Sequence, residues 1–99
     1  MDIVSIQAIE HRHTGHFFST GSMRFFNSRR PQQGYKVGNK AYFITSEQFD
    51  YKSPRLYTLR VINWDTGVID TVGEFNQMTK SQAQTALKNA VKESEAVAL

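Results

Sequence analysis

The sequence predicts a single α+β domain in which an antiparallel β-sheet of four to five strands is covered by a C-terminal α-helix. Three observations lead to this prediction. Residues 55–64 alternate as a strand does, Asp65–Gly67 forms a typical turn before a second strand, and residues 80–94 carry a helical apolar stripe. The 99 residues are the length of one domain, and we expect residues 95–99 to form a frayed tail.

The N-terminal third has the weakest secondary-structure signals. Residues 2–11 alternate apolar and polar side chains as in a strand, although Ile6 and Ile9 also fit a helical turn, and we favour the strand. Farther along, we expect a short helix near residues 22–28. Two apolar side chains lie three positions apart there, as on one face of a helix.

A β-hairpin is expected in the middle of the chain. Residues 34–37 and 40–47 are rich in β-branched and aromatic side chains and flank a tight-turn pair, Gly38-Asn39. Residues 48–55 then form a connecting loop, because the proline within them cannot donate a hydrogen bond to a central ladder.

The C-terminal third has the clearest pattern. Its first strand places Tyr57, Leu59 and Val61 on one side and Thr58 and Arg60 on the other. The Asp-Thr-Gly turn that follows supplies a glycine for a positive φ, and the segment VIDTVGEF returns as the partner strand.

A helix over residues 80–94 completes the predicted fold. Thr79 and Gln82 have the spacing of a capping box, and Lys88 and Lys92 suit the negative end of the helix dipole. The apolar stripe consists of Ala83, Ala86, Leu87, Ala90 and Val91.

Composition excludes several classes of protein. The chain has no cysteine, so disulfides and thiolate metal sites are unavailable. No apolar run approaches the roughly 20 residues that cross a bilayer, and the N-terminus lacks the pattern of a signal peptide. We therefore expect a soluble protein of the cytoplasm that does not contact membranes.

Positive charge is concentrated in one block. Between His11 and Ser46 there is no Asp or Glu, whereas the whole chain carries only +3, so the remaining residues sum to −3. Such a block can attract anionic partners. Its +6 comes from Arg12, Arg24, Arg29, Arg30, Lys36 and Lys40.

Aromatic residues alternate with these cations, which favours binding of single-stranded nucleic acid: cations neutralise phosphates and exposed rings stack on bases. We expect Phe18, Phe26 and Phe43 to be buried, while Arg29 and Arg30 precede a polar loop and should be the most available contacts. The candidate binding residues for nucleic acid or another partner are Arg12, Phe17, Arg24, Arg29, Arg30, Tyr35, Lys36 and Lys40.

Catalysis and metal binding are the weaker alternatives. His11 and His13 on an extended strand would share one face, and His16 could complete a three-imidazole site for a transition metal. No HExxH, GxSxG, GxGxxG or Walker motif is present, so we expect neither an enzyme nor a cofactor, and no catalytic residue is assigned.

Two resemblances bear on function. The segments SMRFFNSR, AYFITSEQFD, PRLYTLRV and TGVIDTVGEF resemble small uncharacterised proteins of tailed phages and prophages, across about residues 15–88. This resemblance implies a bacterial host cell and an accessory role. It also implies an alternative to nucleic-acid contact: an inhibitor or adaptor that docks on a host nucleic-acid-handling or defence complex. The C-terminal strands and helix also resemble the end of a double-stranded RNA-binding domain, although only Lys80 matches that family's lysine cluster.

Overall fold

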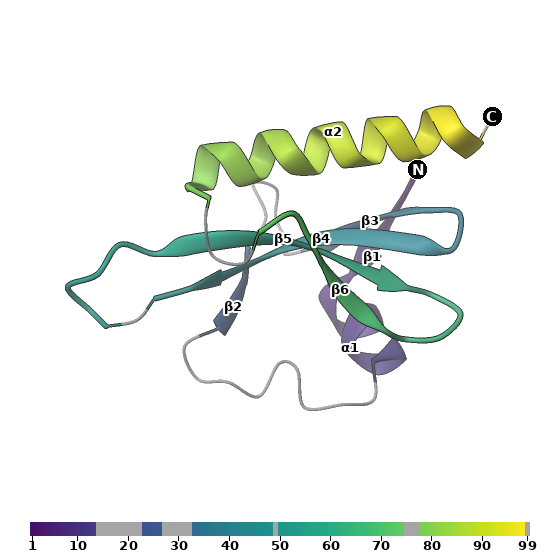
Figure 1. Cartoon of the computed structure of the whole chain (residues 1–99). Coiled ribbons are helices and arrows are strands. Elements are labelled where there is room, and N and C mark those ends of the chain that lie inside the picture. The colour runs from purple at the N-terminus through teal and green to yellow at the C-terminus, as the bar shows by residue number, and fades with distance from the viewer. Residues whose placement is uncertain (14–22, 27–32, 49, 75–77, 99) are drawn as a thin grey trace.

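An antiparallel sheet lies between two helices of very different length, and the chain has the predicted α+β class (Figure 1). The longer helix, α2 (Lys80–Ala98), covers one face, and the shorter helix, α1 (Ile6–Arg12), lies against the other. Within the part of the chain that is described, neither helix is long and apolar enough to cross a membrane. The computed structural model describes residues 1–13, 23–26, 33–48, 50–74 and 78–98, with the backbone alone for 23–26 and 98.

The sheet has a five-strand path, β1-β3-β4-β5-β6, with β2 paired beside it. Strand β4 is bordered on one edge by β5 along its full length. Its other edge is divided, because residues 40–42 pair with β3 and residues 44–47 pair with β2. The strands are β1 (Asp2–Ser5), β2 (Met23–Phe26), β3 (Gln33–Val37), β4 (Lys40–Glu47), β5 (Leu56–Asn63) and β6 (Ile69–Val72).

The face under α2 holds the larger apolar core, and its pattern confirms the prediction. Ala83 and Leu87 of the helix pack on Ile44 and Leu59 of the two central strands. The expected capping box forms: the backbone N–H of Thr79 donates to Gln82 Oε1 (3.0 Å) and that of Gln82 donates to Thr79 Oγ1 (3.3 Å). The helix continues to Ala98, past the expected end at residue 94.

The face under α1 holds a second core made by Ile9, Ala41, Phe43 and Ile62. Here the predicted strand over residues 2–11 is wrong beyond Ser5. The Ser5 hydroxyl accepts a hydrogen bond from the Ala8 N–H (3.1 Å), which caps α1 and ends β1.

The short helix predicted near residues 22–28 is also wrong, because Met23–Phe26 forms β2. Three of its pairs join Arg24, Phe25 and Phe26 to Ser46, Thr45 and Ile44 of β4. Aromatic residues favour strands, and β3 leaves this half of the β4 edge open, so pairing outweighs the weak helical spacing.

Both predicted hairpins are present, and both turns use a glycine with positive φ. Gly38 (φ 60°) begins the β3–β4 turn, and Gly67 (φ 76°) ends the β5–β6 turn. The described residues of the 48–55 loop, which are 48 and 50–55, contain no strand, as expected.

Candidate functional site

The β5–β6 turn places Trp64, the only tryptophan of the chain, at one end of the sheet. The ring is half-buried and packs against the core beneath α1. Its backbone N–H donates to the carbonyl of Asn39 (2.6 Å), which joins the two turns at this end of the molecule. The ring therefore has a fixed position and remains partly accessible to solvent.

Two cations from different elements approach this ring. The guanidinium carbon of Arg12, at the end of α1, lies 5.9 Å from the ring centroid. The Nζ atom of Lys36, on β3, lies 5.6 Å from the same centroid. Both distances are within the range of cation–π attraction. We call Arg12, Lys36 and Trp64 the Trp64 cluster.

Hydrogen bonds hold both cations in place. A terminal nitrogen of Arg12 donates to the carbonyls of Trp64 and Asp65, the second at 3.2 Å. Lys36 Nζ donates to the carbonyl of Gly38 (2.7 Å). These bonds use only part of the donor capacity of each side chain, so the remaining N–H groups can meet an anion without a large loss of side-chain freedom.

The position of Arg12 depends on close packing between α1 and the β5–β6 turn. His13 Nδ1 donates to the carbonyl of Gly67 (2.8 Å). A Cβ atom at Gly67 would collide with the carbonyl oxygen of Arg12. The glycine thus permits the positive φ and also lets the end of α1 approach the turn.

Polar and acidic groups border the cluster. The side-chain amide of Asn39 donates to Asp65 Oδ2 (3.3 Å), and Asp2 faces Lys36 across the β1–β3 ladder. The site is therefore a mixed surface rather than a uniformly positive one. An aromatic ring, fixed cations and amide or carboxylate groups together suit a planar heterocycle that carries a phosphate.

The structure brings together two of the predicted binding residues, Arg12 and Lys36. Lys40 is exposed but lines a groove with Ala90 and Ser94 of α2, so it faces the other side of the sheet. The prediction that Tyr35 is a binding residue is wrong. Its side chain is only 7% exposed and belongs to the core under α2, so it offers no free face for stacking.

Other predicted residues fall outside what the structure describes. Phe17, Arg29 and Arg30 lie outside the described residues, as does Phe18. For Arg24 and Phe26 the backbone alone is described, within β2. Phe43 is fully buried, as expected.

The proposed geometry of the histidines is wrong. His11 lies within α1 and His13 just after it, so they do not alternate along an extended strand. His16 lies outside the described residues. Among the described residues, no group of three or more His, Asp or Glu side chains could hold a metal ion.

A polar cluster around the buried Arg60 also lies on the α1 side of the sheet. Arg60 is 5% exposed, and its Nε and Nη1 atoms donate to Thr45 Oγ1 (3.2 Å) and Thr71 Oγ1 (2.6 Å). Burial lowers the pKa of Arg60, and the charge of Glu47 opposes that shift. Because these hydrogen bonds hold the guanidinium against the sheet, we assign Arg60 a structural role.

Trp64 is the residue that sequence reasoning missed. It lies outside the basic block at 11–46, where aromatic residues alternate with cations along the sequence. A signal was available: a lone tryptophan next to a tight turn lies near a sheet end, where its ring is seldom fully buried.

No curated protein and no solved structure matches the chain. Residues 2–88 match a protein family of unknown function, DUF7447. Because that match includes most of the chain, the protein belongs to this family.

Proposed function

We propose that the protein is a small non-enzymatic accessory protein, of the phage type that its sequence resembles, which binds single-stranded nucleic acid at the Trp64 cluster. The observation that supports this proposal is the convergence of Arg12 and Lys36 on a partly accessible tryptophan ring. Aromatic faces beside fixed cations are the usual elements of single-strand recognition, in which every base can stack and every phosphate can be neutralised.

In this proposal, each group at the cluster has a separate task. The guanidinium of Arg12 lies over the indole, and its outer face offers a plane on which a base can stack. Lys36 contacts the adjoining phosphate, while the amide of Asn39 and the carboxylate of Asp65 reach base edges. We expect Arg29 and Arg30, which lie outside the described residues, to add phosphate contacts.

Fluorescence anisotropy with labelled single-stranded DNA and RNA, repeated across a salt series, tests the proposal. Affinity should fall linearly in log salt, and Trp64 emission should change on binding. Lys36→Gln should reduce the slope by about 0.7, the value for one contact on a single strand. Lys52→Gln, which removes a lysine from the 48–55 loop, is the matched control and should leave the slope unchanged.

Two further results decide between models. Arg29→Ala/Arg30→Ala should weaken binding if the block extends the contact. No binding at low salt, or equal losses for Lys36→Gln and Lys52→Gln, would rule out a specific site at Trp64. In that case the alternative, an inhibitor or adaptor that docks on a host protein complex, becomes the working proposal, and its binding should depend less on salt.

A further inference from the structure

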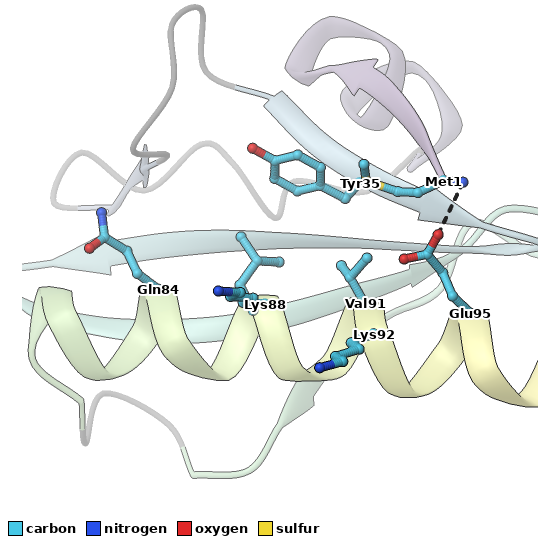
Figure 2. A pocket seen from close by; sticks show the side chains of 8 residues that line it. Met1, Tyr35, Gln84, Lys88, Val91, Lys92 and Glu95 are labelled. Atoms are coloured by element: carbon cyan, nitrogen blue, oxygen red, sulfur yellow. Dashed lines mark ion pairs between the residues drawn. The ribbon is translucent and has the colours of Figure 1, made fainter.

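A groove lies on the α2 face of the sheet, opposite the Trp64 cluster, between α2, Tyr35 of β3 and Met1, which precedes β1 (Figure 2). Its volume is about 580 Å³, and its apolar lining includes Tyr35, Leu87 and Val91. Lys88 and Lys92 also line it, one helical turn apart on α2. Pockets of this size commonly hold a ligand or a few side chains of a partner.

The apolar lining continues beyond the helix onto β1. Helix α2 packs on β3, β4 and β5, and β1 lies outside these strands at the end of the sheet. Ile3 of β1 pairs in register with Tyr35, so both side chains lie on the α2 face. Ile3 and Met1 are each 53% exposed, which leaves an open apolar strip beside the groove.

Strand β1 is also an edge strand. It pairs with β3 on one side, and no described strand pairs with it on the other. Alternate backbone N–H and C=O groups of an antiparallel edge strand point away from its partner, so they can pair with another extended chain. Beside the groove, therefore, lies an edge strand to which another strand can be added.

Charge indicates the kind of chain that fits. Glu95 at one end of the groove is paired with the N-terminal ammonium group (3.5 Å), as Figure 2 shows. Among the described residues, no ion pair involves Lys88 or Lys92. The groove therefore combines an apolar floor with two lysines whose charge is not neutralised by those residues.

We propose that an extended acidic segment of a partner protein adds to the free edge of β1. Every second side chain of the added strand faces the α2 side. Among these, apolar side chains pack on Ile3 and the groove floor, and carboxylates pair with Lys88 and Lys92. This surface lies on the other face of the sheet from the Trp64 cluster, so the proposal does not depend on nucleic-acid binding.

A second copy of the chain is a poorer occupant than an acidic partner. If two copies joined their β1 strands about a two-fold axis, each copy would bring Lys88 and Lys92 to the same shared strip. Like charges at one interface oppose association, whereas carboxylates from a partner would relieve the excess charge.

The probe is an acetylated, fluorescein-labelled octapeptide, Val-Thr-Glu-Thr-Val-Thr-Glu-Thr, in which Val and Glu share one face of the strand. Its charge-swapped counterpart has Lys in place of Glu. We expect the acidic peptide to bind about tenfold more tightly, which is the factor expected when two exposed ion pairs replace two repulsions. Lys88→Glu/Lys92→Glu should reverse this preference. Lys52→Glu, a charge reversal in the 48–55 loop, should leave it unchanged.

N-methylated peptides test strand addition without any change to the protein. Methyl groups on the alternate nitrogens that face β1 should abolish binding, and methyl groups on the other nitrogens should not. Equal tolerance of both sets would overturn the proposal, as would equal affinity for the two charge types. Absence of binding at millimolar peptide, with a β1-dependent dimer in sedimentation, would overturn it in favour of a second copy.

Discussion

The two faces of the sheet are built in different ways. Under α2, one long helix covers an apolar surface with a stripe of residues close together in the sequence. Under α1, a seven-residue helix covers only part of the surface, and the remainder includes the buried Arg60 and its threonine partners. The α2 face can be read from one segment, whereas the α1 face depends on contacts between distant segments.

The two faces also differ in what determines their packing. Packing on the α2 face is determined by the helical periodicity of the apolar stripe, which small changes in packing do not alter. The α1 face obtains its order from close approach: a Cβ at Gly34 would lie 2.8 Å from Ile9 Cδ1 and 3.1 Å from the carbonyl oxygen of Tyr42. The Trp64 cluster stands on this second face, so its geometry should be the more sensitive to single substitutions.

The largest effect should come from truncating the core beneath α1. Phe43 is fully buried, and Phe43→Ala should lower the free energy of unfolding by about 3–5 kcal/mol, measured by urea denaturation. That loss is a large part of the stability of a domain this small.

Leu59→Ala is the matched change beneath α2 and should cost about 2–5 kcal/mol. A cost for Phe43→Ala well below that for Leu59→Ala would mean that the α1 face is a loose covering rather than a second core.

A glycine substitution should test the attachment of α1 to the β5–β6 turn. Gly67→Ala introduces a side chain at a positive φ, which strains the backbone. The new Cβ also collides with the Arg12 carbonyl, and this overpacking should lower the free energy of unfolding by about a further 1–3 kcal/mol. Amide exchange in α1 should become faster. Gly38→Ala is the control: its φ is positive but nothing lies within 4 Å of the new Cβ, so it should cost only about 1–2 kcal/mol.

Helix capping allows the two helices to be compared directly. Thr79→Ala and Ser5→Ala should each cost about 1 kcal/mol, because each removes the side-chain acceptor of a first-turn N–H. Ser81→Ala, an exposed change near the Thr79 cap, should stay within about 0.5 kcal/mol. If Ser5→Ala had no effect on urea denaturation or on amide exchange, α1 would be held by packing alone.

The smallest effect concerns the β4–β5 loop, which belongs to neither face. Hydrogen bonds from the Lys52 N–H, and then from Ser53, lower the pKa of Asp50 below its ordinary 3.8. A lowered carboxyl pKa stabilises the fold above 3.8 and loses that contribution as pH falls through the lower folded value.

The amide shifts of Lys52 and Ser53 should therefore titrate with a midpoint below 3.8 in NMR spectra. The exposed ring of Tyr51 at this loop should gain mobility over the same range. Asp50→Asn should remove the transition. A midpoint at or above 3.8 would contradict the hydrogen bonds that Lys52 and Ser53 donate to the Asp50 carboxylate.

The sequence predicted the features that depend on neighbouring residues. The capping box at Thr79, the glycine turns and the alternation of Tyr57, Leu59 and Val61 are each determined within a few positions. It also predicted that Arg12 and Lys36 belong to one surface, although for a different reason: a shared charge rather than a shared ring.

The sequence could not predict the features that depend on distant partners. Helix α1 has fewer than two turns, and its apolar spacing fits a strand equally well until Ser5 caps it and Gly34 admits Ile9. Strand β2 exists because β3 leaves half of the β4 edge open. The Gly38-Asn39 turn sets the register of Tyr35 with Tyr42, but Tyr35 is buried because α2, from the far end of the chain, covers that face of the hairpin.

The order of the strands has a consequence for the time course of folding. Strands β3 to β6 follow one another both along the chain and across the sheet, whereas β1 and β2 pair with strands that come later in the sequence. Nearby segments meet sooner than remote ones, so we expect strands β3 to β6 and α2 to assemble first, and β1, α1 and β2 to dock last. Trp64 belongs to the early part and touches Arg12 of the late part, so its emission in stopped-flow refolding should lag behind the circular dichroism signal. Simultaneous changes in Trp64 emission and circular dichroism would refute this order. A lag would mean that Trp64 fluorescence reports the final docking step.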